Sequence, residues 1–504
     1  MDLFGSLMAG LSVACEPYNL FFCFLGVFIG TLVGVLPGLG PTATMSILLP
    51  VTYGIPATTA IIMLSGIYYG AYYGGSTTSI LVNIPGEAAS VITCLDGYQM
   101  ARQGRAGPAL GIAAFGSFIA GTVGIIILQI LAPPLVTVAL KFGAPEYFSL
   151  MILGLVILIF LAEKSILKAL MMAGVGTFLG TVGLDTMAGV ARFSFDVPEF
   201  LDGLGIVPMA MGLFGIAEIF LNLEKSIKTE ITSSKINNLL PTLKDWMDSK
   251  WAIIRGTVVG FFLGILPGGG GVLASFVSYA VEKMASKDPQ KFGHGAIEGV
   301  AAPEAANNAA ASGGYIPLLT LGIPVGVVQA ILLGALMMHG ITPGPMLLKE
   351  HPNLFWGVIA SMYVGNVMLL VLNLPLIGLW VKVLRIPYAI LFPLILLFCL
   401  IGAYAINNST VDVAIMLLFG VVGYLMRKFE YEPAPFIMAF VLSPMLETAL
   451  RRSLLLSDGH FTIFLSRSIS LGCLILAALL LVLAALPGFR KRREKIVSEA
   501  EELA

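Results

Sequence analysis

Long apolar stretches recur along the chain from Tyr18 to Pro487, separated by short polar turns or by glycine and proline. A spanning helix needs about 20 residues, so each stretch can cross a bilayer alone or as half of a broken pair. The clearest cover residues 18–36, 56–73, 108–131, 145–162, 166–184, 204–223, 251–266, 326–340, 354–381, 388–406, 411–426 and 461–486. The pattern predicts an all-α polytopic membrane protein with about 10–12 transmembrane segments.

The composition supports a membrane location for most of the chain. Of its 504 residues, 58% are apolar types and 11% are charged, against roughly 25% charged residues in soluble domains. A formal net charge of -1 without a basic patch argues against a nucleic-acid partner. The sequence contains none of the common hydrolase, metalloprotease or nucleotide-binding motifs, so we expect neither enzyme chemistry nor a cofactor, and transport energy would come from an ion gradient or a separate ATPase.

The cysteines and histidines do not predict a metal centre. The five cysteines lie far apart, without the spacing of metal ligands, and are interpreted as small packing residues. The four histidines are equally dispersed. Apart from a coupling Na⁺, we therefore expect no bound metal.

A polar connector divides the chain near its middle. We expect an N-terminal membrane repeat at 1–223, a polar linker at 224–250, a C-terminal membrane repeat at 251–406, additional transmembrane helices at 407–489 and a basic-then-acidic tail at 490–504. The basic residues between Arg490 and Lys495, and the lysines of the linker, predict that the C-terminus and the linker are cytoplasmic. The N-terminal segment before Tyr18 is predicted to form a short interfacial helix.

Two unlike motifs recur in the same order in the two halves. GVLPGLG at 34–40 matches GILPGGG at 264–270, and YGGSTTSILVNIPG at 73–86 matches SGGYIPLLTLGIP at 312–324. Paired interruptions in matching positions are typical of transporters built from inverted repeats, with a substrate site between the repeats. We therefore expect four broken or re-entrant segments that meet at mid-depth.

The first pair of interruptions has the chemistry of an ion site. Proline and glycine end one helix and allow another to begin. The exposed N–H groups of the new helix suit an anion, and the freed carbonyls of the old helix suit a cation. We expect the substrate at Gly38, Gly40, Thr42, Gly268, Gly269 and Gly270, and the coupling cation at Pro37, Gly38, Pro267 and Gly268. The alternative is a glycine kink that permits close helix packing.

The second pair supplies neutral hydrogen-bond donors, which are cheaper to bury than charges. The candidate substrate-binding residues are Ser76, Thr77, Thr78, Asn83, Asn307, Asn308, Gly313 and Gly314. The alternative for the hydroxyls is a bond to the carbonyl one turn earlier, and adjacent Asn307 and Asn308 are not expected to face one ligand together.

Other polar residues are assigned structural roles. Glu304 follows Pro303 and is interpreted as helix-start chemistry, with a protonatable coupling group as the alternative; Glu87 has the same two interpretations. The remaining residues are interpreted as loop residues (Arg102, Arg105), headgroup anchors (Arg451, Arg452) and packing aromatics (Tyr68, Tyr69, Tyr72, Tyr73).

At 34–56, 72–118, 264–283 and 295–324 the sequence closely resembles the large membrane subunit of bacterial tripartite tricarboxylate transporters. The resemblance implies a small membrane subunit of about four helices and a periplasmic solute-binding protein as partners, in the bacterial inner membrane. It also implies import of di- or tricarboxylates such as citrate, driven by Na⁺ or protons. The residues carried over are Gly38–Thr44, Ser76–Asn83, Gly268–Gly271 and Asn307–Asn308 with the Gly-Gly pair that follows.

Two alternatives stay open at this point. Tyr315 stands where the resemblance predicts a smaller residue, so the cargo could instead be another organic anion, such as a sugar acid or an aromatic acid. A membrane scaffold without transport activity is less consistent with two matched pairs of interruptions.

Overall fold

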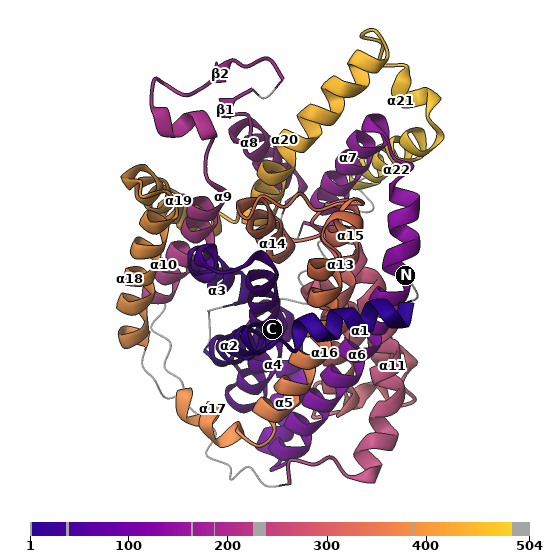
Figure 1. The fold of residues 1–504 in the computed structure, drawn as a ribbon. Coiled ribbons are helices and arrows are strands. Elements are labelled where there is room, and N and C mark those ends of the chain that lie inside the picture. Colours follow the sequence, from indigo (N-terminus) through magenta and orange to yellow (C-terminus); the bar gives the residue numbers. More distant parts are fainter. Residues whose placement is uncertain are drawn as a thin grey trace.

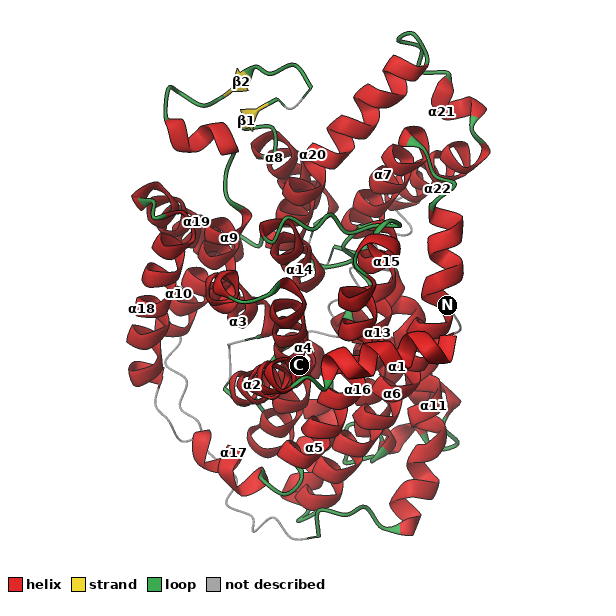
Figure 2. Cartoon of the chain, viewed as in Figure 1, coloured by secondary structure: helices red, strands yellow, loops and turns green. Residues whose placement is uncertain are grey.

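The computed structural model describes residues 3–36, 40–162, 165–185, 187–224, 238–384 and 388–485. Most of these residues are helical, and the strands among them are limited to one short hairpin (Figure 2). The α-helices of the first half are α1 Leu3–Ala14, α2 Pro17–Val35, α3 Pro41–Leu48, α4 Ala57–Val82, α5 Thr93–Arg102, α6 Ala106–Ala139, α7 Ala144–Phe160, α8 Ile166–Leu179, α9 Ile206–Ala210 and α10 Ala217–Glu224. Those of the second half are α11 Leu243–Ile265, α12 Gly271–Ala285, α13 Glu298–Leu321, α14 Val327–Met338, α15 Leu347–Glu350, α16 Pro352–Asn373, α17 Ile377–Val383, α18 Tyr388–Asn407, α19 Thr410–Lys428, α20 Pro433–Leu456, α21 Ile463–Ser466 and α22 Ser468–Ala485.

Shorter elements connect these helices. They are the 3₁₀ turns η1 Leu49–Gly54, η2 Ala88–Ser90, η3 Pro198–Asp202 and η5 Pro289–Lys291, the π-helical segment η4 Met211–Ile216, and the antiparallel strands β1 Gly183–Leu184 and β2 Ala191–Arg192. In Figure 1, the hairpin and α21 lie at the upper end of the molecule, and α5 and α17 lie at the lower end.

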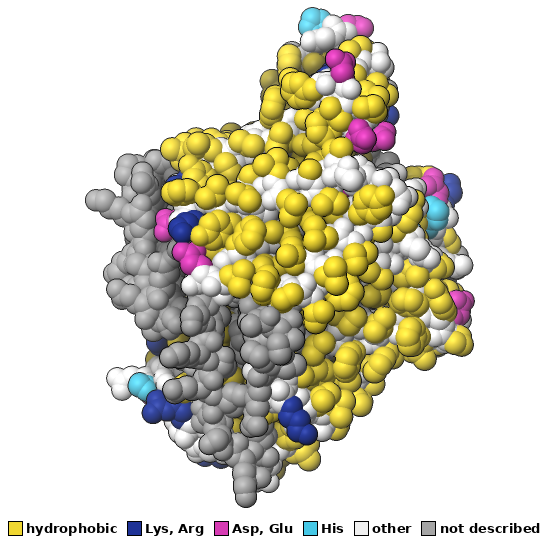
Figure 3. Space-filling model, turned by 90° about the vertical axis from the view of Figure 1, so that its left-hand side faces the viewer, with side chains coloured by type: hydrophobic (Ala, Val, Ile, Leu, Met, Phe, Trp, Pro, Cys, Tyr) yellow, Lys and Arg dark blue, Asp and Glu magenta, His cyan; other side chains and the backbone are white. Residues whose placement is uncertain are grey.

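The fold class predicted from the hydrophobic pattern is confirmed. Among the described residues, six helices are long and apolar enough to cross a membrane: α2, α6, the continuous stretch from α9 to α10, α16, α19 and α20. Six shorter apolar helices add to them. Figure 3 shows one side of the molecule, where hydrophobic side chains cover most of the described surface and charged ones lie at its margins. The larger number of crossings stays a prediction.

In the first half, α2 and α4 are in backbone contact along their length. Helix α2 has three glycines spaced four residues apart. A Cβ atom added to any of them would overlap a backbone carbonyl oxygen of α4. They are Gly26, Gly30 and Gly34, which face Met63, Ile67 and Ala71 respectively. Small residues at this spacing let two membrane helices approach more closely than larger side chains allow.

The second half repeats this contact between α11 and α13. Gly256, Gly260 and Gly264 of α11 face the carbonyl oxygens of Ala302, Ala306 and Ala310 of α13. Each pair has a counterpart in the first half, in the same order and with the same spacing. The repeat found in the sequence is therefore a structural repeat of two helix pairs.

The first pair of interruptions ends helices as expected. Helix α11 ends at Ile265, Gly268 and Gly270 adopt positive φ angles of 77° and 33°, and α12 begins at Gly271. The N–H of Gly268 donates to the carbonyl oxygen of Val325, 2.7 Å away, in the loop after α13. In the first half α2 ends at Val35 and α3 begins at Pro41, whereas Pro37 and Gly38 lie outside the described residues.

The prediction that the Gly-Gly motifs break the second helix of each half is wrong. Helix α4 continues through Gly74 and Gly75, and α13 continues through Gly313 and Gly314. These glycines serve close packing: a Cβ at Gly313 would lie 2.5 Å from the carbonyl oxygen of Phe261, and Gly74 faces the carbonyl oxygen of Thr31. An unbroken helix also satisfies its own backbone, which the membrane interior demands.

Both helices end later within the same segments, 73–86 and 312–324, in matching ways. Asn83 after α4 and Gly322 after α13 are left-handed, with φ angles of 60° and 72°. The polar linker is shorter than its composition indicates, since α11 begins at Leu243 and the side chain of Thr242 caps it in a capping box with Asp245.

We predict that Gly260→Ala destabilises the fold. The added Cβ would fall well inside van der Waals distance of the Ala306 backbone, which cannot move without displacing α13. Overpacking of this kind costs about 1–3 kcal/mol. Thermal unfolding of the purified protein in detergent measures the loss.

The matched control is Gly174→Ala on α8, where nothing lies within 4 Å of the new methyl group. Helix propensity predicts a neutral or slightly stabilising effect there. Equal melting temperatures for the two variants would contradict the proposed backbone contact.

Candidate functional site

The carboxyl group of Glu304 is at the centre of a buried polar cluster. Its side chain is 0% exposed. Oε2 accepts a hydrogen bond from Ser76 Oγ at 2.5 Å and from Asn307 Nδ2 at 3.3 Å, and Oε1 accepts one from Thr93 Oγ1 at 2.5 Å. Hydrogen bonds to a charged or chargeable group are the stronger ones in proteins.

Four helices supply the Glu304 cluster. Glu304 lies on α13, Ser76 on α4 and Thr93 at the first residue of α5. Ser117 on α6 donates to the backbone carbonyl oxygen of Glu304 at 3.1 Å. The cluster therefore joins the two halves of the chain.

The helix-start interpretation of Glu304 is wrong. Helix α13 begins at Glu298, and Pro303 lies inside it. The carboxyl consequently faces other helices, not the free N–H groups of a first turn. Glu87, in contrast, does begin a helical turn: it caps η2, its Oε2 accepts from the N–H of Ala89 at 2.7 Å, and Ser90 completes a capping box.

Asn307 and Asn308 are both buried and bonded to each other. Asn308 Nδ2 donates to Asn307 Oδ1 at 2.7 Å and to the carbonyl oxygen of Glu304 at 3.1 Å. Asn307 therefore contacts the carboxyl group of Glu304, and the hydrogen bond from Asn308 fixes the orientation of the Asn307 side chain.

The neighbouring hydroxyl side chains of Ser76, Thr77 and Thr78 on α4 have different roles. Ser76 belongs to the Glu304 cluster, whereas Thr78 donates to the carbonyl oxygen of Val35 at 2.6 Å and so satisfies the end of α2. Thr77 is buried. Asn83 is exposed beyond the end of α4 and is not brought to the cluster.

A small cavity adjoins the Glu304 cluster. It is lined by Tyr73, Ser76, Thr77, Leu110, Ala113, Ala114, Ser117 and Asn373, and its volume of about 10 Å³ has room for about one water molecule. Asn373 Oδ1 is buried there without a hydrogen-bond partner among the described residues. Buried polar atoms are almost always paired, so this oxygen marks the cavity as a hydration site.

Residues of both interruptions lie near a second buried carboxyl, that of Glu87. A Cβ built at Gly40, the residue before α3, would lie 3.9 Å from Glu87 Cβ. The hydroxyl of Tyr72 lies against Gly271 at the start of α12, where it would be 2.5 Å from a Cβ added to that glycine.

A chain of polar side chains continues from this point. Tyr72 donates to the hydroxyl of Tyr68 at 3.3 Å, and Gln329 Nε2 donates to the same hydroxyl at 3.3 Å. The Tyr68–Tyr72 pair therefore has polar contacts in addition to the packing expected from the sequence. Gly314 lies against Gln329, as Gly75 lies against Glu87 in the first half.

The remaining predicted glycines lie in the second interruption. Gly269 donates to the carbonyl oxygen of Leu266 at 2.8 Å and is buried, while Gly268 and Gly270 are partly buried. Pro267 and Thr42 are also partly buried. In the part of the chain that the structure describes, no group of three or more metal-ligating side chains occurs.

The sequence analysis missed Thr93, Ser117 and Asn373. None of these residues belongs to one of the repeated motifs, and each lies at or beside the Glu304 cluster on a different helix. The available signal was Glu304 itself, an acidic residue in an otherwise alanine-rich helix with no basic residue near it in the sequence.

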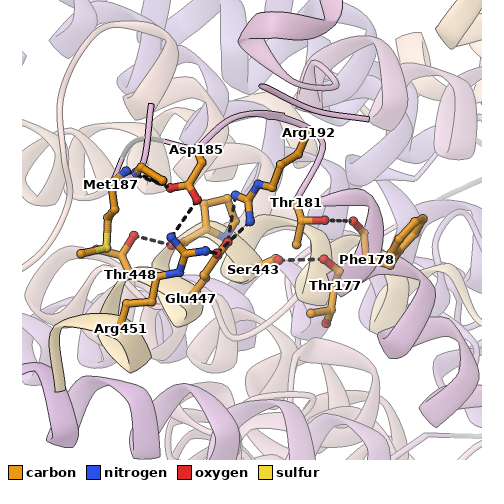
Figure 4. A network of polar contacts seen from close by, with 12 residues as sticks. Thr177, Phe178, Thr181, Asp185, Met187, Arg192, Ser443, Glu447, Thr448 and Arg451 are labelled. Carbon is orange, nitrogen blue, oxygen red and sulfur yellow. Dashed lines mark hydrogen bonds and ion pairs between the residues drawn. The ribbon is translucent and has the colours of Figure 1, made fainter. Parts of the chain in front are cut away.

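A second polar cluster lies near the β hairpin (Figure 4). Arg192 forms two hydrogen bonds to Glu447, at 2.8 and 3.1 Å, and Arg451 contacts Asp185 at 2.7 Å and Glu447 at 2.8 Å. Arg451 is therefore paired, which the headgroup-anchor interpretation did not foresee. Arg105 is similarly paired, with Asp245 at 2.7 Å.

The arginines of the hairpin cluster are neutralised by their partners. These side chains line a cavity of about 200 Å³ beside α20. The backbone N–H groups of Met187 and Ala188, together with Arg451, lower the pKa of Asp185 to about 2. The lining of this cavity carries two arginines and three carboxylates, those of Asp185, Asp202 and Glu447. It therefore offers no net positive charge to an anion, and we assign the cluster to the structure of the loop.

Comparison with known proteins gives one family. A family model described as the tripartite tricarboxylate transporter TctA family matches residues 20–438. An uncharacterised 52.8 kDa protein in the TAR-I ttuC' 3'region of Agrobacterium vitis is 53% identical over 501 residues, which cover 99% of this chain and all of that protein. An uncharacterised protein in the TAR-II ttuC' 3'region of the same organism is 53% identical over 240 residues, 48% of this chain and 99% of that protein. No solved structure matches.

We predict that Asp185→Asn loosens the hairpin loop by removing the charge that Arg451 contacts. Limited trypsin digestion should cut after Arg192 about threefold faster, because cleavage follows the population of the open loop. Asp202→Asn, which changes an exposed carboxyl of the same cavity, is the control.

The difference in the cleavage rate of the loop between wild type and Asp185→Asn should also depend on pH. The pKa of Asp185 is lower in the folded protein than in the unfolded chain, so the ionised carboxyl stabilises the folded loop fully at pH values above the ordinary aspartate pKa. This stabilisation disappears as the pH falls through the folded-state pKa of about 2. Equal cleavage rates at neutral pH would show that the ion pair does not hold the loop.

Proposed function

Because the chain belongs to the tripartite tricarboxylate transporter TctA family, we propose that it is the translocation subunit of a cation-coupled importer of di- or tricarboxylates such as citrate. It is a multi-pass membrane protein and a subunit of a transporter. The proposal extends this to a small membrane subunit of about four helices and a periplasmic solute-binding protein as partners. It places the chain in the bacterial inner membrane with its C-terminus in the cytoplasm.

The observation that carries the proposal is the position of the two interruptions. Gly40 from the first half lies beside Glu87, and Gly271 from the second lies against Tyr72 of α4, the helix whose Gly75 faces Glu87. No side chain of the N-cap residue caps α3 or α12, and the N–H of Gly271 bonds the Tyr72 hydroxyl. Uncapped N–H groups and the positive end of the helix dipole favour a carboxylate, which supports substrate binding between the repeats.

The predicted substrate and cation residues have distinct tasks in this proposal. In this proposal the substrate binds beside the glycines of the interruptions, where α3 and α12 begin, and Ser76 and Asn308 belong to the polar cluster that responds to the coupling cation. The N–H groups of Gly268 and Gly269 are bonded to carbonyl oxygens of the protein and hold the interruption in shape. Carbonyls freed around Pro37, Gly38, Pro267 and Gly268 would hold Na⁺ if Na⁺ is the coupling ion. Movement of one repeat against the other would then expose the site to the opposite face.

The test is uptake of labelled citrate and smaller dicarboxylates into proteoliposomes that contain the partner subunits, with an imposed Na⁺ or proton gradient. We expect accumulation that disappears when both gradients are dissipated. A panel of sugar acids and aromatic acids tests the alternative cargo, which Tyr315, a fully buried bulky residue, left open. Uptake that needs no gradient, or none for any organic anion, would contradict the proposal.

Within this assay we predict that Ser76→Ala and Asn308→Ala each lower the uptake rate by about tenfold. Ser76→Ala removes a hydrogen bond to the Glu304 carboxyl, and Asn308→Ala removes the bonds that orient Asn307 toward that carboxyl. A net hydrogen bond is worth about 0.5–1.5 kcal/mol, and about 1.4 kcal/mol corresponds to a tenfold change. Ser453→Ala on α20 is the control, since this buried hydroxyl only bonds the carbonyl of Ala449 one turn earlier. Normal uptake by both variants would place the functional site elsewhere.

A further inference from the structure

We propose that Glu304 is the group that binds and releases a coupling proton, with Ser76 as its hydrogen-bond switch. This inference rests on the proposed transport function and specifies its coupling ion. It starts from the hydrogen-bond geometry around the carboxyl, not from the motif in which Glu304 stands.

The hydroxyl of Ser76 contacts two acceptors but has one proton. Ser76 Oγ lies 2.5 Å from Glu304 Oε2 and 3.1 Å from the carbonyl oxygen of Tyr72. A carbonyl oxygen can only accept. When Ser76 donates to Tyr72, the short contact with Glu304 therefore requires a proton on Oε2, which then donates to Ser76 Oγ.

When the proton leaves Oε2, the same atoms remain satisfied without moving. The Ser76 hydroxyl turns from the Tyr72 carbonyl to the carboxylate, and the other contacts of the carboxylate persist: Thr93 donates to Oε1 and Asn307 to Oε2. Both protonation states thus have a complete hydrogen-bond pattern. A site built only to hold helices together would need just one.

Among the described residues, no basic side chain bonds the Glu304 carboxyl. The titratable side chains that interact with it are Tyr73 on α4, Glu87 beside η2 and Cys94 on α5, and none of them is basic. Helix α6 has no charged residue, and the nearby charges of α11 and α12, Arg255 and Glu282, are paired with each other at 2.7 Å. A buried carboxylate without a cation is costly, so a proton is the simplest compensating charge.

A route for the proton adjoins the site. Ser76 and Ser117, both bonded to Glu304, also line the cavity that holds the unpaired Asn373 Oδ1. A water molecule in that cavity would be adjacent to Ser76, which can pass a proton between the water and Oε2. The Na⁺ alternative is weaker at this position, because Asn307 presents an N–H donor to Oε2 where Na⁺ would need an acceptor.

Two measurements on the assembled transporter in proteoliposomes test the proposal, with the variant Glu304→Gln and the control Glu298→Gln, which changes the acid at the first residue of α13, where Glu298 pairs with Lys291. Accumulation driven by a pH gradient should fall at least tenfold in Glu304→Gln, while exchange of internal for external substrate without a gradient falls no more than about threefold. Wild type and Glu298→Gln should both move protons with the substrate, recorded by a pH dye in the vesicles. Glu304→Asp, which keeps a titratable group, should retain part of the accumulation.

Accumulation by Glu304→Gln at the wild-type level, or accumulation driven by Na⁺ without proton movement, would overturn the proton assignment while leaving organic-anion transport intact. Infrared difference spectra over a pH titration add a readout that needs no transport. A C=O stretching band of a protonated carboxyl should titrate in wild type and Glu298→Gln and be missing in Glu304→Gln. Its absence from wild type overturns the proposal whatever the transport assays give, so failure here is distinguishable from failure of the proposed function.

Discussion

Close contact between helix backbones at regularly spaced glycines is the constraint on which the rest of this structure depends. In each half, three glycines spaced four residues apart replace side-chain contacts by contact with carbonyl oxygens of the partner helix. In a membrane there is no hydrophobic gain from pairing two apolar helices, so packing quality has to supply the attraction. Because the glycine contacts have the same spacing in both halves, α4 and α13 end at matching positions. The loops that follow these two helices therefore lie against the interruptions.

The close packing also explains why the polar cluster is possible. Helices held together this tightly bury the Glu304 side chain completely and leave room for about one water molecule in the adjoining cavity. In such a place every polar atom needs a protein partner, because an unpaired one costs about 1–3 kcal/mol. The hydroxyls of Ser76 and Thr93 and the amide of Asn307 meet this need, and only Asn373 is left to the small cavity.

Much of the architecture could be predicted from the sequence, since it depends on composition and local rules. The helical membrane class, the end of α11 before Gly268 and the order of the repeated motifs follow from hydrophobic runs and from glycine and proline. The Gly-Gly motifs were misinterpreted because glycine has two uses, breaking a helix and permitting contact. Only the partner helix, with Phe261 opposite Gly313, decides between them.

The role of Glu304 could not be found locally for a related reason. Its best partner, Ser76, lies 228 positions earlier in the chain, and Thr93 lies 211 positions earlier. A first-turn acid after proline is a sound local interpretation, but α13 had already begun at Glu298. The decisive information was which surfaces of α4, α5 and α13 face one another, and this is a property of the packing.

The position of the cluster links its chemistry to motion. Glu304 belongs to the helix pair of the second half, whereas Ser76 and Thr93 belong to the first half. Backbone contacts at glycines also join the halves, as where Gly176 faces the carbonyl oxygen of Phe436, but the contact at Glu304 depends on side chains. Under the proposed proton coupling, the hydrogen-bond direction at this carboxyl would reverse when the proton leaves. That change would alter side-chain bonds between the halves and leave the backbone contacts intact, which is how a proton could be coupled to alternating access.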